Sequence, residues 1–231
     1  MDDYLFDAIK SSNIVIVKDV LNSGINPNIR KGYTIPLNYA IQSVSDYKYH
    51  KNYILHDRMI KIIELLLERG ADPNFSNIEG FTPLMHASMV NEKEIVNLLL
   101  NNGADPNLKN DDGNTALIYA IESYNSEFII ELLLNAGADP TIKNNRGQTA
   151  YDIAIEDGMD EYAEDLFLLL KRYMMMYKMQ RRRRRNLTYR KKRTQLAYKN
   201  LALSKLLDTY DVDEPLTRVM RRETIRSLMD Y

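Results

Sequence analysis

The sequence predicts an all-α repeat solenoid over about residues 1–172, followed by a basic, partly helical C-terminal extension over 173–231. Two observations support this fold class. Gly-Ala-Asp-Pro recurs at Gly70, Gly103 and Gly137, with a weaker copy, Gly-Ile-Asn-Pro, at Gly24. Four apolar columns precede these glycines at constant spacing: Ile16, Ile62, Ile95, Ile129; Val17, Ile63, Val96, Ile130; Val20, Leu66, Leu99, Leu133; and Leu21, Leu67, Leu100, Leu134. Self-similarity with a period of about 33 residues is typical of stacked repeats.

The most regular copy shows how one unit is expected to fold. Thr82 can cap a first helix, and Pro83 occupies the first helical position, where its missing N–H costs nothing. Apolar residues at helical spacing between Glu92 and Asn102 predict a second helix, and Gly103 supplies the left-handed residue that ends it. The Asp-Pro-Asn sequence that follows favours a turn. Each unit is therefore predicted to be helix, turn, helix and hairpin turn.

These motifs resemble those of the ankyrin-repeat family. The family patterns Gly-x-Thr-Pro-Leu-His-x-Ala and Leu-Leu-x-x-Gly-Ala-Asp recur in order over about residues 1–172. The resemblance implies an ankyrin-repeat stack with units at about 1–30, 31–77, 78–110, 111–144 and 145–172. One position departs from the family: its usual histidine is replaced by Asn38, Met85, Ile118 and Asp152. The hydrogen bonds that this histidine normally makes to the neighbouring turn are therefore not expected in their usual form.

The end units are predicted to cap the stack. In the first unit, Asp19 replaces the leucine found at the same position in later units, which indicates a polar outer face. The fifth unit keeps its first-helix motif but lacks the terminal Gly-Ala-Asp. No Gly or Pro lies between Gly158 and Pro215, so its second helix is expected to continue beyond the stack.

The second unit carries an insertion. Gly24 and Gly70 are 46 residues apart, whereas the later intervals are 33 and 34, and Val44 to Asp57 accounts for the excess. The insertion is rich in tyrosine and histidine. It is interpreted either as an extended helix or surface loop, or as a partner-specific contact, since loops carry function and tyrosine is favoured at interfaces.

The resemblance also implies where a partner binds. Ankyrin-repeat proteins bind through the hairpin tips and the exposed side of the first helices. The matching residues of units three to five are Ile78, Glu79, Phe81, Met89, Val90, Asp111, Asp112, Asn114, Glu122, Ser123, Asn145, Arg146 and Gln148. Exposed apolar groups such as Phe81 and Met89 are suited to anchoring a partner.

Nothing in the sequence predicts an enzyme, a metal site or a cofactor. There is no Cys, which removes disulfides and thiolate metal sites. His50 and His56 are six residues apart, a spacing that does not place them on the same face of a helix. His86, two residues before Ser88, is interpreted as a helix surface residue. The recurrent glycines end helices and do not form a phosphate loop. We therefore expect a non-catalytic protein-interaction module with an unknown protein partner.

The C-terminal extension has the opposite charge to the repeats. Residues 1–173 carry a net charge of −11 and residues 174–231 a net charge of +10. The basic residues concentrate in two runs: Arg181, Arg182, Arg183, Arg184 and Arg185, then Arg190, Lys191, Lys192 and Arg193. Four interpretations remain open: an import signal, a nucleic-acid-binding segment, an intramolecular mask of the acidic repeats, or an inert solvated tail. Mutual repulsion of the arginines predicts disorder or marginal helix in the first run, with a break at 186–188. Beyond it we expect a helix over about 194–207, a linker at 211–215 and a short helix over 217–229.

Composition limits the remaining possibilities. No apolar run approaches the roughly 18 residues that span a bilayer, and the start of the chain, Met-Asp-Asp-Tyr, lacks a basic leader. We expect an intracellular monomer, located in the cytoplasm or, if the basic run directs import, in the nucleus. Abundant Asn and Ile favour an AT-rich genome, viral or protist.

Overall fold

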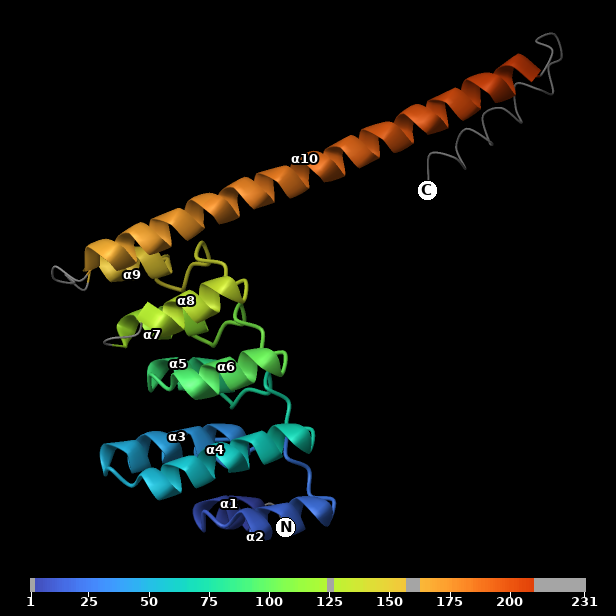
Figure 1. Cartoon of the computed structure of the whole chain (residues 1–231). Coiled ribbons are helices and arrows are strands. Elements are labelled where there is room, and N and C mark those ends of the chain that lie inside the picture. The colour runs from blue at the N-terminus through green and yellow to red at the C-terminus, as the bar shows by residue number, and fades with distance from the viewer. Residues whose placement is uncertain (1–2, 124–126, 157–162, 210–231) are drawn as a thin grey trace. The chain divides into compact units, whose positions relative to one another are not determined.

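The structure, a computed structural model, describes residues 3–123, 127–156 and 163–209, and within these ranges all regular elements are helices (Figure 1). The helices are α1 (Asp3–Lys10), α2 (Ile14–Asn22), α3 (Pro36–Tyr49), α4 (Tyr53–Glu68), α5 (Pro83–Met89), α6 (Lys93–Asn101), α7 (Ala116–Glu122), α8 (Glu127–Asn135), α9 (Ala150–Glu156) and α10 (Ala163–Thr209). The chain divides into two units, residues 1–177 and 178–231.

Within residues 1–177, helix pairs stack in the order of the chain, α1 with α2, α3 with α4, α5 with α6, and α7 with α8 (Figure 1). The first helices of successive pairs contact one another from α1 through α3, α5 and α7 to α9. The second helices form a parallel layer, in which α2 contacts α4 and α6 contacts α8. The predicted all-α repeat solenoid is confirmed.

The apolar columns form one continuous core. Ile62, Ile95 and Ile129 are at most 1% exposed, and they belong to a single buried cluster that runs through the stack. Ile16, at the same position of the first unit, is 45% exposed because it lies on the outer side of that unit, where no described helix pair covers it. The expectation that Ile16 is buried with the rest of its column is therefore wrong, whereas the predicted polar group of the outer face, Asp19, is exposed as expected.

Asparagine side chains tie each unit to the next. Asn28, Asn74 and Asn107 each use both ends of the side-chain amide on the Gly-Ala-Asp segment that begins the following turn. Their Nδ2 groups donate to the carbonyls of Gly70 (2.9 Å), Gly103 (3.0 Å) and Gly137 (3.1 Å), and their Oδ1 atoms accept from the N–H groups of Asp72 (2.7 Å), Asp105 (2.8 Å) and Asp139 (2.6 Å). The repeated bonds satisfy backbone groups in the turn that follows each second helix.

The hairpin tips are also joined by backbone hydrogen bonds. The N–H of Asp111 donates to the carbonyl of Glu79 at 3.0 Å, and the N–H of Asn145 donates to the carbonyl of Asp112 at 2.9 Å. Gly80 makes this approach possible, because a Cβ there would lie 3.0 Å from the Cα of Asn110, and its φ of +73° disfavours other residues. Neighbouring hairpins therefore form a closely packed edge.

The insertion of the second unit forms helix. The helices α3 and α4 have 14 and 16 residues, whereas α5 and α6 have seven and nine. The extended-helix interpretation of residues 44–57 is thus confirmed. A three-residue turn at 50–52 joins the two longer helices.

The helix α10 corrects the prediction for the basic run. It continues without interruption across 186–188, so the predicted break is wrong. Of the two predicted states of the run, disorder or marginal helix, the structure has helix, and the helix predicted over about 194–207 is part of α10. Arginine is a good helix former, and successive side chains point about 100° apart around a helix, which separates adjacent charges in water. The predicted domain boundary at 172–173 falls within this helix. The predicted linker at 211–215 and helix at 217–229 lie outside the described residues.

The continuous core predicts a large cost for removing a central leucine. Leu99 is fully buried, so Leu99→Ala should lower the free energy of unfolding by roughly 2–5 kcal/mol through lost apolar contact and a residual cavity. Urea unfolding followed by circular dichroism measures this cost. The exposed Glu131→Ala serves as a control, for which a change within about 0.5 kcal/mol is expected. Equal effects of the two substitutions would contradict the buried core.

Candidate partner-binding face

The structure leaves the predicted partner-binding residues accessible. We call this surface the hairpin face, and it consists of Ile78, Glu79, Phe81, Met89, Val90, Asp111, Asp112, Asn114, Glu122, Ser123, Asn145, Arg146 and Gln148. None of the thirteen is buried; Ile78 is 55% exposed and Met89 43% exposed. Because α5, α7 and α9 are neighbours and the hairpin tips are hydrogen-bonded, these side chains lie on adjoining units. Their role in binding remains a prediction.

Three buried asparagines hold the hairpins in shape. Asn77 Oδ1 accepts hydrogen bonds from the N–H groups of Glu79 (3.0 Å) and Phe81 (2.9 Å). Asn110 and Asn144 make corresponding bonds within the next two hairpins. These asparagines were not predicted from the sequence, although each lies three positions before a hairpin glycine, a regularity that could have identified them. These hydrogen bonds hold the backbone of each hairpin in one conformation.

Aromatic rings lie beside the hairpins. The rings of Phe81 and Tyr119 meet edge to face with centroids 4.9 Å apart, and Phe81 also meets the imidazole of His86 at 5.8 Å. The Tyr119 hydroxyl accepts a hydrogen bond from Asn110 Nδ2 at 2.9 Å. All three rings are partly exposed. Tyr39, His86 and Tyr119 occupy the same place in successive first helices, a pattern that could have been read from the sequence.

His86 is held neutral by its surroundings. Burial lowers its pKa from 6.5 to about 4, opposed by a smaller effect of the Asp46 carboxylate. The imidazole Nε2 lies 3.0 Å from Gln42 Oε1, which fits the tautomer with its proton on Nε2. The hairpin face therefore gains no positive charge from this residue at neutral pH.

The positions that replace the family histidine behave differently from one another. Asn38 keeps a bond to the following unit, because its Nδ2 donates to the Phe81 carbonyl at 3.2 Å. Asp152 instead caps its own helix by accepting from the N–H and hydroxyl of Thr149 at 2.8 and 2.7 Å, and these bonds lower the pKa of Asp152. Met85 and Ile118 are buried in the core. The expected departure from the usual bonding is thus found at three of the four positions.

The His86–Ser88 pair has no catalytic geometry. Ser88 is fully buried, and its hydroxyl donates to the Leu84 carbonyl at 2.8 Å, away from the imidazole. In the described part of the chain, no three His, Asp or Glu side chains are grouped to hold a metal ion. The Ser88 hydroxyl is therefore not placed for activation by the His86 imidazole.

The insertion contacts the third unit through an ion pair in which the carboxylate is buried and the lysine is half-exposed. Lys48 Nζ lies 3.0 Å from a Glu92 oxygen, and His56 Nε2 lies 3.9 Å from the other carboxylate oxygen. Glu92 is only 4% exposed. A groove of about 470 Å³ adjoins this cluster, with Tyr53 and Phe128 among its lining residues. This contact between the insertion and the neighbouring unit was not predicted from the sequence.

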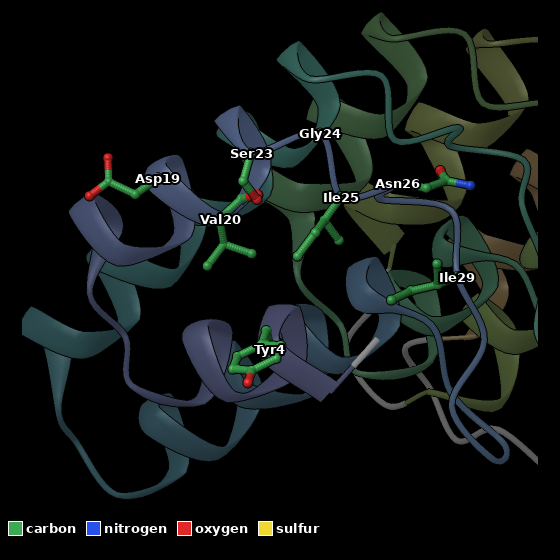
Figure 2. A pocket seen from close by; sticks show the side chains of 8 residues that line it. All are labelled: Tyr4, Asp19, Val20, Ser23, Gly24, Ile25, Asn26 and Ile29. Atoms are coloured by element: carbon green, nitrogen blue, oxygen red, sulfur yellow. The ribbon is translucent and has the colours of Figure 1, made fainter. Parts of the chain in front are cut away.

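A second hollow, of about 730 Å³, lies on the first unit between α1 and the end of α2 (Figure 2). Val20 and Ile25 point into it from one side and Tyr4 lies opposite, whereas Asp19 points away (Figure 2). The equivalent side of each later unit is covered by the preceding helix pair. The hollow therefore corresponds to a stacking surface without a described neighbour.

The basic run lies in α10 and is exposed to solvent. All nine predicted residues, from Arg181 to Arg185 and from Arg190 to Arg193, are exposed. The helix carries them over more than three turns without an intervening acidic residue.

Comparison with known proteins gives two overlapping matches to a family described as ankyrin repeats in three copies, over residues 52–144 and 109–173. The chain is also similar to an ankyrin repeat protein of Fowlpox virus (strain NVSL), with 33% identity over 86 residues. This similarity covers 37% of the chain and only 10% of the viral protein. The relative is viral, which is one of the two sources favoured by the Asn- and Ile-rich composition.

The lowered pKa of His86 predicts a pH-dependent contribution to stability. The unfolded chain binds a proton at this position below about 6.5, whereas the folded chain binds it only near 4, so stability from this group is complete above 6.5 and falls between these values. Between pH 7 and pH 4.5, wild type should lose roughly 2 kcal/mol more than His86→Gln, which does not titrate. Urea unfolding at both pH values measures the difference. Equal losses would show that His86 does not bind its proton differently in the two states.

Proposed function

Because the chain belongs to the ankyrin-repeat family, we propose that it is a non-catalytic interaction module that binds a partner protein through the hairpin face. Ankyrin repeats generally mediate protein–protein interaction. The observation that carries the proposal is the contrast between the core and the hairpin face. Of the eight column residues of units three and four, seven are buried and Leu100 is partly buried, whereas all thirteen face residues are accessible.

The geometry of the face supports binding in a preformed state. The hairpins are held by internal asparagines and by backbone bonds to their neighbours, so little ordering is needed on association. Preorganisation of this kind reduces the entropic cost of binding. Ile78 and Met89 provide exposed apolar anchors at the two ends of the third unit's first helix region.

The absence of activity and the location of the protein also belong to this proposal. Ankyrin repeats are typically non-catalytic, and we extend that to this chain together with the expectation that no cofactor is required. In the described ranges no helix is both long and apolar enough to cross a bilayer. We place the protein inside the cell as a monomer whose partner sets its role.

Site-directed crosslinking tests the proposed face. A photoreactive amino acid at Ile78 in the full chain should give a crosslinked partner, because this side chain projects from a hairpin tip. The matched control carries the same group at Glu64, which is exposed on α4 in the layer of second helices. Stronger crosslinking at Glu64 than at Ile78, with both proteins folded by circular dichroism, would count against the hairpin face.

A second candidate function concerns the basic helix. The chain would act as a nucleic-acid-associated adaptor in which the basic run binds phosphate while the repeats recruit a protein. One observation favours this candidate: the run is helical and its nine basic side chains are exposed, and an α-helix fits the major groove of DNA. The alternative role of the same run is targeting, as a nuclear import signal.

Replacing the five residues Arg181 to Arg185 by Gln in the full chain separates these roles. If the run binds phosphate, duplex DNA should be retained in a mobility-shift assay with affinity that falls steeply with salt, and the slope of log affinity against log salt should shrink by up to about 4 in the variant. If the run only directs import, DNA affinity is unchanged and a fluorescent fusion of the variant loses nuclear accumulation. If the variant changes neither DNA binding nor nuclear accumulation, both roles of the run are rejected.

A further inference from the structure

The middle of the hairpin face carries negative charge alone. Residues 77–90 and 110–123, which supply the hairpins and first helices of units three and four, contain no Lys or Arg. They contain four carboxylates, Glu79, Asp111, Asp112 and Glu122, and all four residues are exposed. Carboxylates that share one surface without intervening cations attract a positively charged partner and repel a negative one.

Three of these carboxylates are gathered on one edge. The hydrogen bond from the Asp111 N–H to the Glu79 carbonyl places the two hairpin tips side by side, and Asp112 follows directly in the chain. The tight approach at Gly80 fixes this spacing. The negative groups are therefore held together by the backbone and do not depend on side-chain flexibility.

Aromatic rings adjoin the same hairpins. Phe81 and Tyr119 are partly exposed and meet at 4.9 Å, so their rings form one contiguous surface that spans units three and four. Ring faces attract guanidinium and ammonium groups, and the planar guanidinium of arginine also stacks on aromatic rings. His86, next to Phe81, stays uncharged at neutral pH and does not oppose a cation.

Three cations on the neighbouring hairpins contact other groups. Lys31 is paired with Asp3, and Arg30 lies over the Phe75 ring at 4.4 Å while donating to the Ser76 carbonyl. Lys109 Nζ donates to the Lys143 carbonyl at 2.9 Å. These contacts occupy three nearby cations. Arg146 is exposed on the next hairpin, one residue after Asn145, whose N–H donates to the Asp112 carbonyl, so the acidic edge ends at the hairpin of unit five.

We propose that the partner presents a basic segment, with Arg or Lys side chains between apolar residues, and that this segment lies along the hairpins of units three and four. A cationic side chain is placed between Glu79 and the Asp111–Asp112 pair and contacts the Phe81–Tyr119 rings. Apolar neighbours of that side chain contact Ile78 and Met89. This inference rests on the proposed interaction function and adds the chemistry of the partner.

Labelled peptides test the inference with the full chain. Three peptides of about 12 residues share a Leu- and Ser-containing sequence and differ only at four positions, which are all Arg, all Gln or all Glu. At about 50 mM salt, the Arg peptide should bind at least about tenfold more tightly than the Gln peptide by fluorescence anisotropy, and the preference should shrink at about 300 mM salt. Hydrogen exchange should show Arg-peptide protection at residues 77–82 and 110–119.

Charge-neutralised variants provide the matched comparison. Asp111→Asn with Asp112→Asn should weaken Arg-peptide binding by about tenfold, whereas Glu64→Gln with Glu131→Gln, which removes two exposed carboxylates from the second helices, should leave it within about twofold. Melting followed by circular dichroism verifies that both variants fold. Equal effects of the two pairs would overturn the inference.

The outcomes separate this inference from the proposed function. Equal binding of the Arg and Gln peptides, with protection of the same hairpin amides, overturns the charge preference and leaves the face as a protein-binding surface. Absence of hairpin protection with every peptide overturns the inference as well. The crosslinking experiment at Ile78 then decides the proposed function by itself, because it makes no assumption about charge.

Discussion

The structure depends on the coupling of each repeat unit to the next. Two kinds of contact provide it: buried apolar side chains between successive helix pairs, and hydrogen bonds from Asn28, Asn74 and Asn107 to the following turn. A single helix pair cannot bury its apolar sides alone, so each unit is stable only against its neighbours. Folding, rigidity and the position of every hairpin follow from this constraint.

Coupling also explains how residues of different units come to share one surface. The same bonds that join the units set the distance between hairpin tips, and they bring Glu79 next to Asp111 and Phe81 next to Tyr119 although these residues belong to different units. A surface built from several units can recognise an extended segment of a partner. Its affinity depends on exposed side chains that the core does not constrain.

Much of the fold was predictable because its signals are repeated and local. Thr82, Pro83 and Gly103 mark helix ends through their own backbone chemistry, and four apolar columns fix the register. The hairpin face followed from that register and the family resemblance. Contacts between distant residues were not predictable: nothing local links Lys48 to Glu92 or Phe81 to Tyr119. The break expected at 186–188 was wrong because the repulsion between adjacent arginines was given more weight than their helix propensity.

The central claim, that neighbouring units are coupled through their hairpins as well as their helices, is tested most directly by NMR-detected hydrogen exchange of the full chain. The amides of Asp111 and Asn145 lie in exposed hairpins but donate to the preceding unit, so they should exchange at rates close to those of the buried α6 and α8 amides. Exchange of these two amides at the rate of an unstructured chain, while the helices remain protected, would contradict the account.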